Sequence, residues 1–151
     1  MHLELYNSDL LNFVEFNITG DNDDYKRCDV ESKYLDATVF YLVQPCFENA
    51  NSTYDYFFGT KYNARKIIVL RNDLLENQKQ FESITDLSSL ITLINSRFMG
   101  KEFLNELESD EPDWQEKWQG INERIIAVHR DLIELAEKCA FEERVLWVLG
   151  Y

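Results

Sequence analysis

Seven carboxylates and no basic residue occur between Glu102 and Glu116, and this run is the strongest chemical signal in the sequence. The acids are Glu102, Glu106, Glu108, Asp110, Glu111, Asp113 and Glu116. Acids at the start of a helix complement the helix dipole by about 0.3–1 kcal/mol each, but a few are enough for that purpose. Because seven like charges in one short segment repel one another, the run favours a surface that a cationic partner covers.

A second acidic segment consists of Asp21, Asp23 and Asp24. Its spacing begins like a calcium-binding loop, with acids at the first and third positions. Lys26 stands where such a loop needs glycine, and Ser32 stands where it needs the final glutamate. The sequence therefore predicts no dedicated metal site here, and we expect these acids to be a secondary part of the partner-binding surface.

Residues that usually perform catalysis are scarce. The chain has two histidines, His2 and His129, and three separated cysteines without a C-x-x-C pair. It lacks zinc-ligand spacing, a G-x-S-x-G motif and a glycine-rich phosphate loop. His129 lies beside an apolar helical stripe, where a core-edge position is the more common role. We predict no catalytic residue, no metal and no cofactor, and a binding protein in place of an enzyme.

The overall charge narrows the partner class. The chain has 151 residues, with 28 acids against 15 Lys and Arg, and a net charge of −13. This charge argues against direct binding to nucleic acid or an anionic membrane, because both attract cationic surfaces. The length and the 45% hydrophobic content fit a single domain over residues 1–151. Unpaired cysteines, no secretory leader pattern and no apolar run of about 18 residues predict a cytoplasmic protein.

The N-terminal half of the chain predicts β-strands. Val14, Phe16 and Ile18 alternate with polar residues, which indicates a half-buried strand over residues 14–18. Runs rich in apolar and aromatic residues predict further strands at 37–43, 54–58 and 66–70, and a closing strand at 145–149.

The C-terminal half predicts helices. Ser83 and Asp86 fit a capping box before an apolar helical face, and we expect Gly100 to end or bend that helix. A longer helix is expected after Pro112. Its apolar seam steps by three and four residues through Trp114, Trp118, Ile121, Ile125, Val128, Leu132, Leu135 and Cys139. Further apolar residues widen the seam, which favours packing on the protein's own sheet over a coiled-coil dimer.

These patterns predict an α+β fold. A mixed or antiparallel β-sheet from the N-terminal half packs against C-terminal helices, and a final strand ends the chain. Trp114 stands next to the acidic run. Because tryptophan and tyrosine commonly anchor protein–protein contacts, we include Trp114 in the predicted partner-binding surface.

In size, acidity and lack of a catalytic motif, the chain resembles bacterial immunity proteins of the polymorphic-toxin and contact-dependent growth inhibition type. Two fragments are also similar to the barstar family of ribonuclease inhibitors: residues 83–87 before an amphipathic helix, and residues 134–139 before the final strand. The resemblance implies an inhibitor that is monomeric when free. It would neutralise a basic toxin, with a nuclease as the expected target, by covering its cationic surface.

Three alternatives stay open from the sequence. A phage or mobile-element protein could mimic DNA to block a defence nuclease, using the same charge. An uncharacterised enzyme could use carboxylates for its chemistry. A helical adaptor could dimerise through the apolar seam of the last helix.

Overall fold

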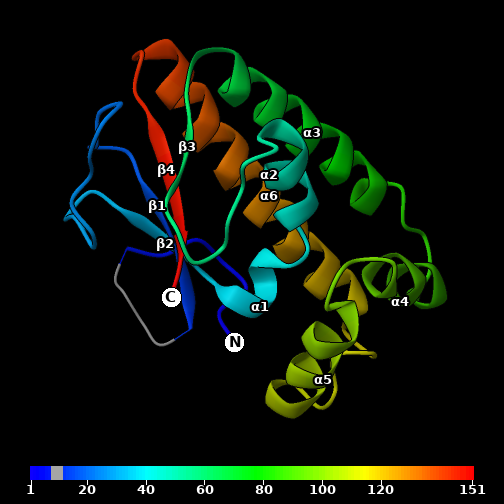
Figure 1. Ribbon diagram of the computed structural model, residues 1–151. Helices are drawn as coiled ribbons and strands as arrows, with labels where there is room; N and C mark the ends of the chain where they lie inside the picture. The colour runs from blue at the N-terminus through cyan, green and yellow to red at the C-terminus, as the bar shows by residue number, and fades with distance from the viewer. Residues whose placement is uncertain (8–11) are drawn as a thin grey trace.

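The computed structural model describes residues 1–7 and 12–151 of the chain. Its strands are β1 (Phe13–Asn17), β2 (Lys33–Asp36), β3 (Thr60–Tyr62) and β4 (Leu146–Gly150). Its helices are α1 (Ala37–Phe40), α2 (Gln44–Ala50), α3 (Ala64–Glu82), α4 (Leu87–Asn95), α5 (Gly100–Asp110) and α6 (Trp118–Phe141). The strands pair antiparallel in the order β2-β1-β4-β3, and the helices pack on one face of this sheet (Figure 1). This confirms the predicted α+β fold with a closing C-terminal strand.

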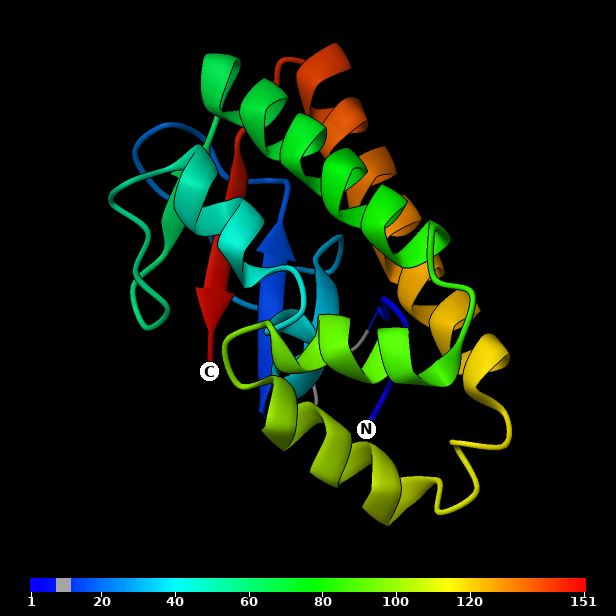
Figure 2. The ribbon, with the colours of Figure 1, turned by 90° about the vertical axis from the view of Figure 1, so that its right-hand side faces the viewer.

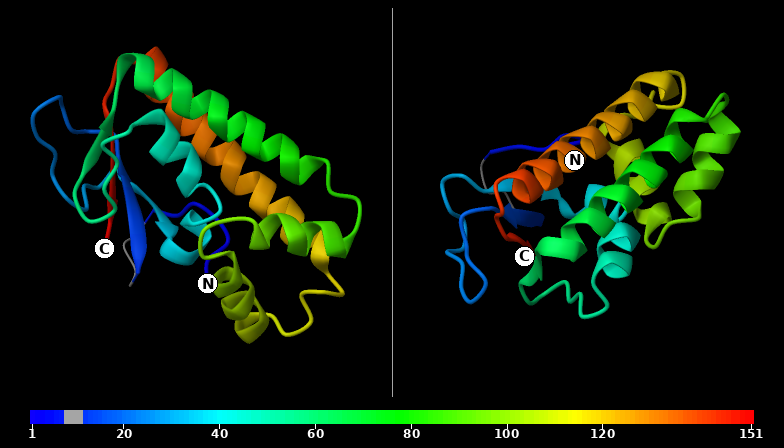
Figure 3. Two further views of the ribbon diagram at one scale, coloured as in Figure 1. Left: turned by 45° about the vertical axis from the view of Figure 1, so that its right-hand side comes forward. Right: turned by 90° about the horizontal axis from the view of Figure 1, so that it is seen from above.

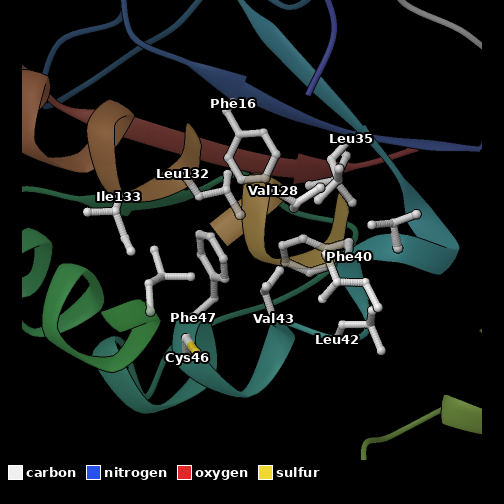
Figure 4. Packing of buried hydrophobic residues seen from close by; sticks show 14 of the residues in the cluster. Phe16, Leu35, Phe40, Leu42, Val43, Cys46, Phe47, Val128, Leu132 and Ile133 are labelled. Atoms are coloured by element: carbon white, nitrogen blue, oxygen red, sulfur yellow. The ribbon is translucent and has the colours of Figure 1, made fainter. Parts of the chain in front are cut away.

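The central strands β1 and β4 follow the predicted alternation. Val14 and Phe16 of β1 point into the main core, where Phe16 is paired with Val148 of β4. Figure 4 shows Phe16 packed among side chains from α1, α2 and α6, including Phe40, Phe47 and Leu132. Each fully buried aromatic or aliphatic side chain of this kind contributes about 1.5–3 kcal/mol through burial.

The other face of the sheet is covered by the loop of residues 18–32. Val145, Trp147 and Leu149 form a small second cluster there, and Tyr25 from the loop packs against Trp147 with ring centroids 4.6 Å apart. Asn17 holds the loop, since its amide donates to the Lys26 carbonyl at 2.8 Å. Both faces of β1 are therefore buried, although the sequence predicted a half-buried strand.

Three of the predicted strands are wrong. Residues 37–43 form α1 and the turn after it, because Asp36 caps the helix by accepting a hydrogen bond from the Thr38 amide at 3.0 Å. Residues 66–70 form the first turns of α3, whose buried positions are Ile67, Leu70, Leu74, Asn77 and Phe81. Residues 54–58 form a loop of turns and bends.

The predicted helix boundaries need three corrections. The long helix expected after Pro112 begins only at Trp118, after turns that include Trp114. Ser83 ends α3, whereas Asp86 is the N-cap of α4 and accepts from the Ser89 amide at 2.8 Å. Gly100 begins α5 and does not end the preceding helix. It packs so closely on the Ile94 carbonyl oxygen that no Cβ would fit, which explains the need for glycine.

Helix α6 buries its apolar seam inside the protein. It lies alongside α3 across the sheet (Figures 2 and 3), and α3 and α6 are the most extensively packed pair of elements. Ile121, Ile125, Val128, Leu132 and Cys139 are all buried in the main core. These side chains are therefore not accessible to a second copy of the chain in this structure, which counts against the adaptor hypothesis.

Gly120 is expected to be replaceable by alanine with a gain in stability. It is exposed within α6, and a Cβ at this position would meet no other atom within 4 Å. Alanine restricts the unfolded chain and favours the helix, so Gly120→Ala should raise the free energy of unfolding by about 0.5–1 kcal/mol. Urea denaturation would measure this change. An unchanged or lower midpoint would show that α6 needs local flexibility here.

Candidate acidic binding surface

The seven acids predicted to bind a partner are brought together by α5 and the turns that follow it. Glu102, Glu106, Glu108 and Asp110 lie on α5, whereas Glu111, Asp113 and Glu116 lie between α5 and α6. All are exposed or half-buried. We call these seven residues the α5 acidic surface, and it occupies one end of the molecule (Figure 2).

The N-terminal ammonium group lies at the edge of this surface. It forms an ion pair with Asp110 and lies 4.0 Å from Glu106. The hydrogen bond from this group to Asp110 raises the pKa of the Met1 ammonium group above its usual value. Glu106 also accepts a hydrogen bond from the Thr38 hydroxyl at 2.5 Å, which joins α5 to α1.

Three more acids of the α5 acidic surface have intramolecular partners. Arg124 of α6 pairs with Glu111 at 2.6 Å. Lys117 pairs with Asp113, and this hydrogen bond lowers the pKa of the Asp113 carboxyl group. Glu108 accepts a hydrogen bond from the indole Nε1 of Trp114 at 2.5 Å.

Glu102 and Glu116 differ from the other five. Within residues 1–7 and 12–151, neither carboxylate has a hydrogen bond or an ion pair. Both are exposed. They are therefore the acids of this surface that a partner could engage without breaking an existing contact.

Trp114 does not belong to the accessible surface. Its side chain is buried, with 2% exposed, and is part of the main core. The sequence placed it on the apolar seam of the long helix, but it lies in the turns before α6, which begins at Trp118. A partner could not reach the indole without opening the structure, so we remove Trp114 from the candidate contact residues.

The second acidic segment lies apart from the first. The loop carrying Asp21, Asp23 and Asp24 is at the opposite end of the molecule from α5 (Figure 1). The Asp21 carboxylate accepts hydrogen bonds from the amides of Asp23 at 2.8 Å and Asp24 at 2.9 Å, which lower its pKa. Asp21 therefore shapes the loop, and one partner surface of ordinary size would not contain both segments.

Comparison with known proteins places this geometry in no established family. The chain matches no protein-family model, no curated protein and no solved structure. Its function must therefore be argued from its own residues.

His129 is buried in a chain of polar contacts, as a core position requires. Its Nδ1 lies 2.8 Å from the Ile125 carbonyl, and its Nε2 lies 3.0 Å from the Asn77 amide nitrogen. The Asn77 oxygen accepts a hydrogen bond from Arg97 at 2.5 Å, which fixes its amide nitrogen as a donor. Burial lowers the pKa of His129 to about 4, so the ring is neutral at pH 7 and inaccessible to a substrate.

A groove of about 1030 Å³ runs along α6, and none of the residues of the α5 acidic surface lines it. Its lining carries both signs of charge, with Glu31 and Asp131 near Lys33 and Lys138. In the described part of the chain, no group of three or more His, Cys, Asp and Glu side chains is arranged to hold a metal ion.

None of the described helices combines the length and the apolar character that crossing a membrane requires.

Sequence reasoning missed Asp36 and the two exposed phenylalanines Phe57 and Phe98. Asp36 raises the pKa of the Met1 ammonium group through its charge. Both Asp36 and Met1 are far from α5 in the sequence. Phe57 and Phe98 are exposed aromatic residues, 73% and 63% accessible. The signal for Phe57 was its position among turn-forming residues, which the prediction of a strand at 54–58 obscured.

Proposed function

We propose that this chain is a cytoplasmic inhibitor of the immunity-protein type, which binds a basic toxin and covers its cationic surface. A nuclease is the expected class of toxin, because its active site must attract phosphate groups. The observation that carries the proposal is the α5 acidic surface: exposed carboxylates gathered on one helix and its following turns, of which Glu102 and Glu116 have no partner within the described residues.

Electrostatic attraction suits this task. Complementary charge raises association rates to about 10⁸–10⁹ M⁻¹s⁻¹ at low salt, and a cell that makes a toxin benefits from rapid neutralisation. A DNA mimic would instead need acids spaced along an extended surface. The loop at Asp21 offers little for that purpose, since Asp21 is committed to its own backbone.

The test is a pair of charge reversals at the acids without internal contacts. Glu102→Lys combined with Glu116→Lys should weaken binding to the basic toxin domain that this chain is proposed to neutralise about 10- to 100-fold, mainly through slower association. Reversing Glu106, Glu108 or Asp110 is less informative, because those side chains hold Thr38, Trp114 and the N-terminus.

The control makes the same change of charge elsewhere. Glu134 and Glu143 are exposed, lying in the C-terminal half of α6 and just after it, so Glu134→Lys with Glu143→Lys changes the net charge equally. Association rates at two salt concentrations, together with residual nuclease activity, would be measured. Equal effects of the two pairs would contradict a binding role for the α5 acidic surface.

A further inference from the structure

Aromatic side chains from three separate segments lie beside α1, which packs on α5. Phe57 and Phe98 are exposed, whereas Tyr41 and Tyr56 are half-buried. Phe98 precedes α5, and its ring contacts the edge of Tyr41 with centroids 6.1 Å apart. Tyr56 and Phe57 are 5.1 Å apart in the same manner. The rings of Phe40 and Tyr54 lie 6.4 Å apart, which brings the segment of Tyr41 next to that of Tyr56. We call Tyr41, Tyr56, Phe57 and Phe98 the aromatic strip.

The loop that carries Tyr56 and Phe57 is held in place. The Tyr56 carbonyl accepts a hydrogen bond from the Gly150 amide at 2.8 Å, and the Tyr56 ring lies over Gly150, where no Cβ would fit. The Phe57 amide donates to the Asp55 carboxylate at 2.9 Å. These contacts fix the backbone under an exposed ring, so a partner would gain contact area without ordering this loop.

The surroundings of the aromatic strip are acidic. Asp36 is the N-cap of α1, whose C-cap is Tyr41, and Asp55 adjoins Tyr56 in sequence. Thr38, three residues before Tyr41, donates to Glu106, which lies one helical turn after Glu102 on α5. The strip and the acids of α5 are therefore continuous across α1.

We propose that the aromatic strip and the adjoining carboxylates of α5 form one docking surface for an arginine-rich face of a basic protein. This inference rests on the proposed inhibitor function and names the chemistry of its partner. Arginine stacks on aromatic rings and pairs with carboxylates in the same contact, whereas lysine acts mainly as a point charge. A second copy of this chain is a poor occupant, because its matching surface carries the same charge and the chain has a net charge of −13.

Nona-arginine and nona-lysine peptides are the probes for this surface. We expect nona-arginine to bind at least 5-fold more tightly than nona-lysine at 150 mM salt, and to shift the aromatic NMR signals of Tyr41, Tyr56, Phe57 and Phe98. Phe57→Ala combined with Phe98→Ala should remove most of this preference. Phe141→Ala is the matched control, since this ring is 91% exposed at the end of α6, away from the strip.

The outcomes separate this inference from the proposed function. Equal affinities for the two peptides, with shifts confined to α5, would overturn the role of the aromatic strip and leave the acidic inhibitor intact. Shifts at the strip that persist after Glu102→Lys and Glu116→Lys would support the strip and count against the acids. No shift at either place would overturn both.

Discussion

Replacing Glu15 by alanine is expected to lower the free energy of unfolding by about 3–4 kcal/mol, because three hydrogen-bond donors would lose their acceptor. Glu15 is fully buried on β1, on the face covered by the loop of residues 18–32. Its carboxylate accepts from the Cys28 amide at 2.9 Å, the Ser32 hydroxyl at 2.7 Å and the Tyr151 hydroxyl at 2.8 Å. It thus ties the loop and the C-terminal residue to the centre of the sheet.

A milder variant separates this network from simple loss of volume. Tyr151→Phe removes one donor and keeps the ring, which packs on Phe13 with centroids 4.5 Å apart. Its expected cost is about 1.5 kcal/mol, at the low end for a bond to a charged group, because Tyr151 is partly exposed. Urea denaturation and hydrogen exchange at the Cys28 amide would measure both effects. A cost below about 1 kcal/mol for Glu15→Ala, with unchanged exchange at Cys28, would show that the loop is held by other contacts.

The parts of the fold that could be predicted are those with a regular local pattern. Residues 14–18 alternate cleanly, and β1 is found at Phe13–Asn17. The predicted seam keeps helical spacing from Trp118 to Cys139, so α6 was identified although it begins later than expected. The strand predicted at 37–43 failed because a continuous apolar run fits a buried helix as well as a strand. The feature that favours a helix there is the N-cap Asp36. It is a single side chain, and β-propensity does not take it into account.

The start of α3 was missed because Ile67, Ile68 and Val69 are consecutive β-branched residues, which are typical of a strand. Asn77 is buried in α3, where an apolar residue would be expected, and its partners are the Leu42 carbonyl and His129. Those partners come from segments 35 and 52 residues away in the chain. The candidate site could likewise be predicted only in part. The run of acids is visible in the sequence, but the ion pairs of Asp110 with the Met1 ammonium group and of Glu111 with Arg124 depend on the tertiary structure.

Acidification is expected to destabilise the protein through His129, by up to about 3 kcal/mol between pH 6.5 and pH 4. Burial is the largest cause of the low pKa, and nearby Arg97 lowers it further, while the Ile125 carbonyl and Glu82 act in the opposite direction. Protonating Nε2 would also set two donors against each other, because the Asn77 amide already donates to that nitrogen. In the unfolded chain His129 takes up a proton near pH 6.5, whereas in the folded chain it does so only near pH 4. The unfolded state therefore binds more protons within this window, and stability is complete above it and falls as the pH is lowered.

His129→Gln isolates this effect from the many carboxylates that titrate at lower pH. Glutamine keeps a polar side chain at position 129 but does not titrate. We expect the variant to have a lower free energy of unfolding than the wild type at pH 7.5. We also expect this free energy to fall less in the variant than in the wild type between pH 7.5 and pH 4.5. The measurement is the free energy of unfolding in urea at four pH values, with the NMR titration of the His129 ring as a direct check. Parallel loss of stability in both proteins would mean that His129 does not titrate in this range. A smaller slope in the variant would instead show that the packing of α3 against α6 depends on keeping this imidazole neutral.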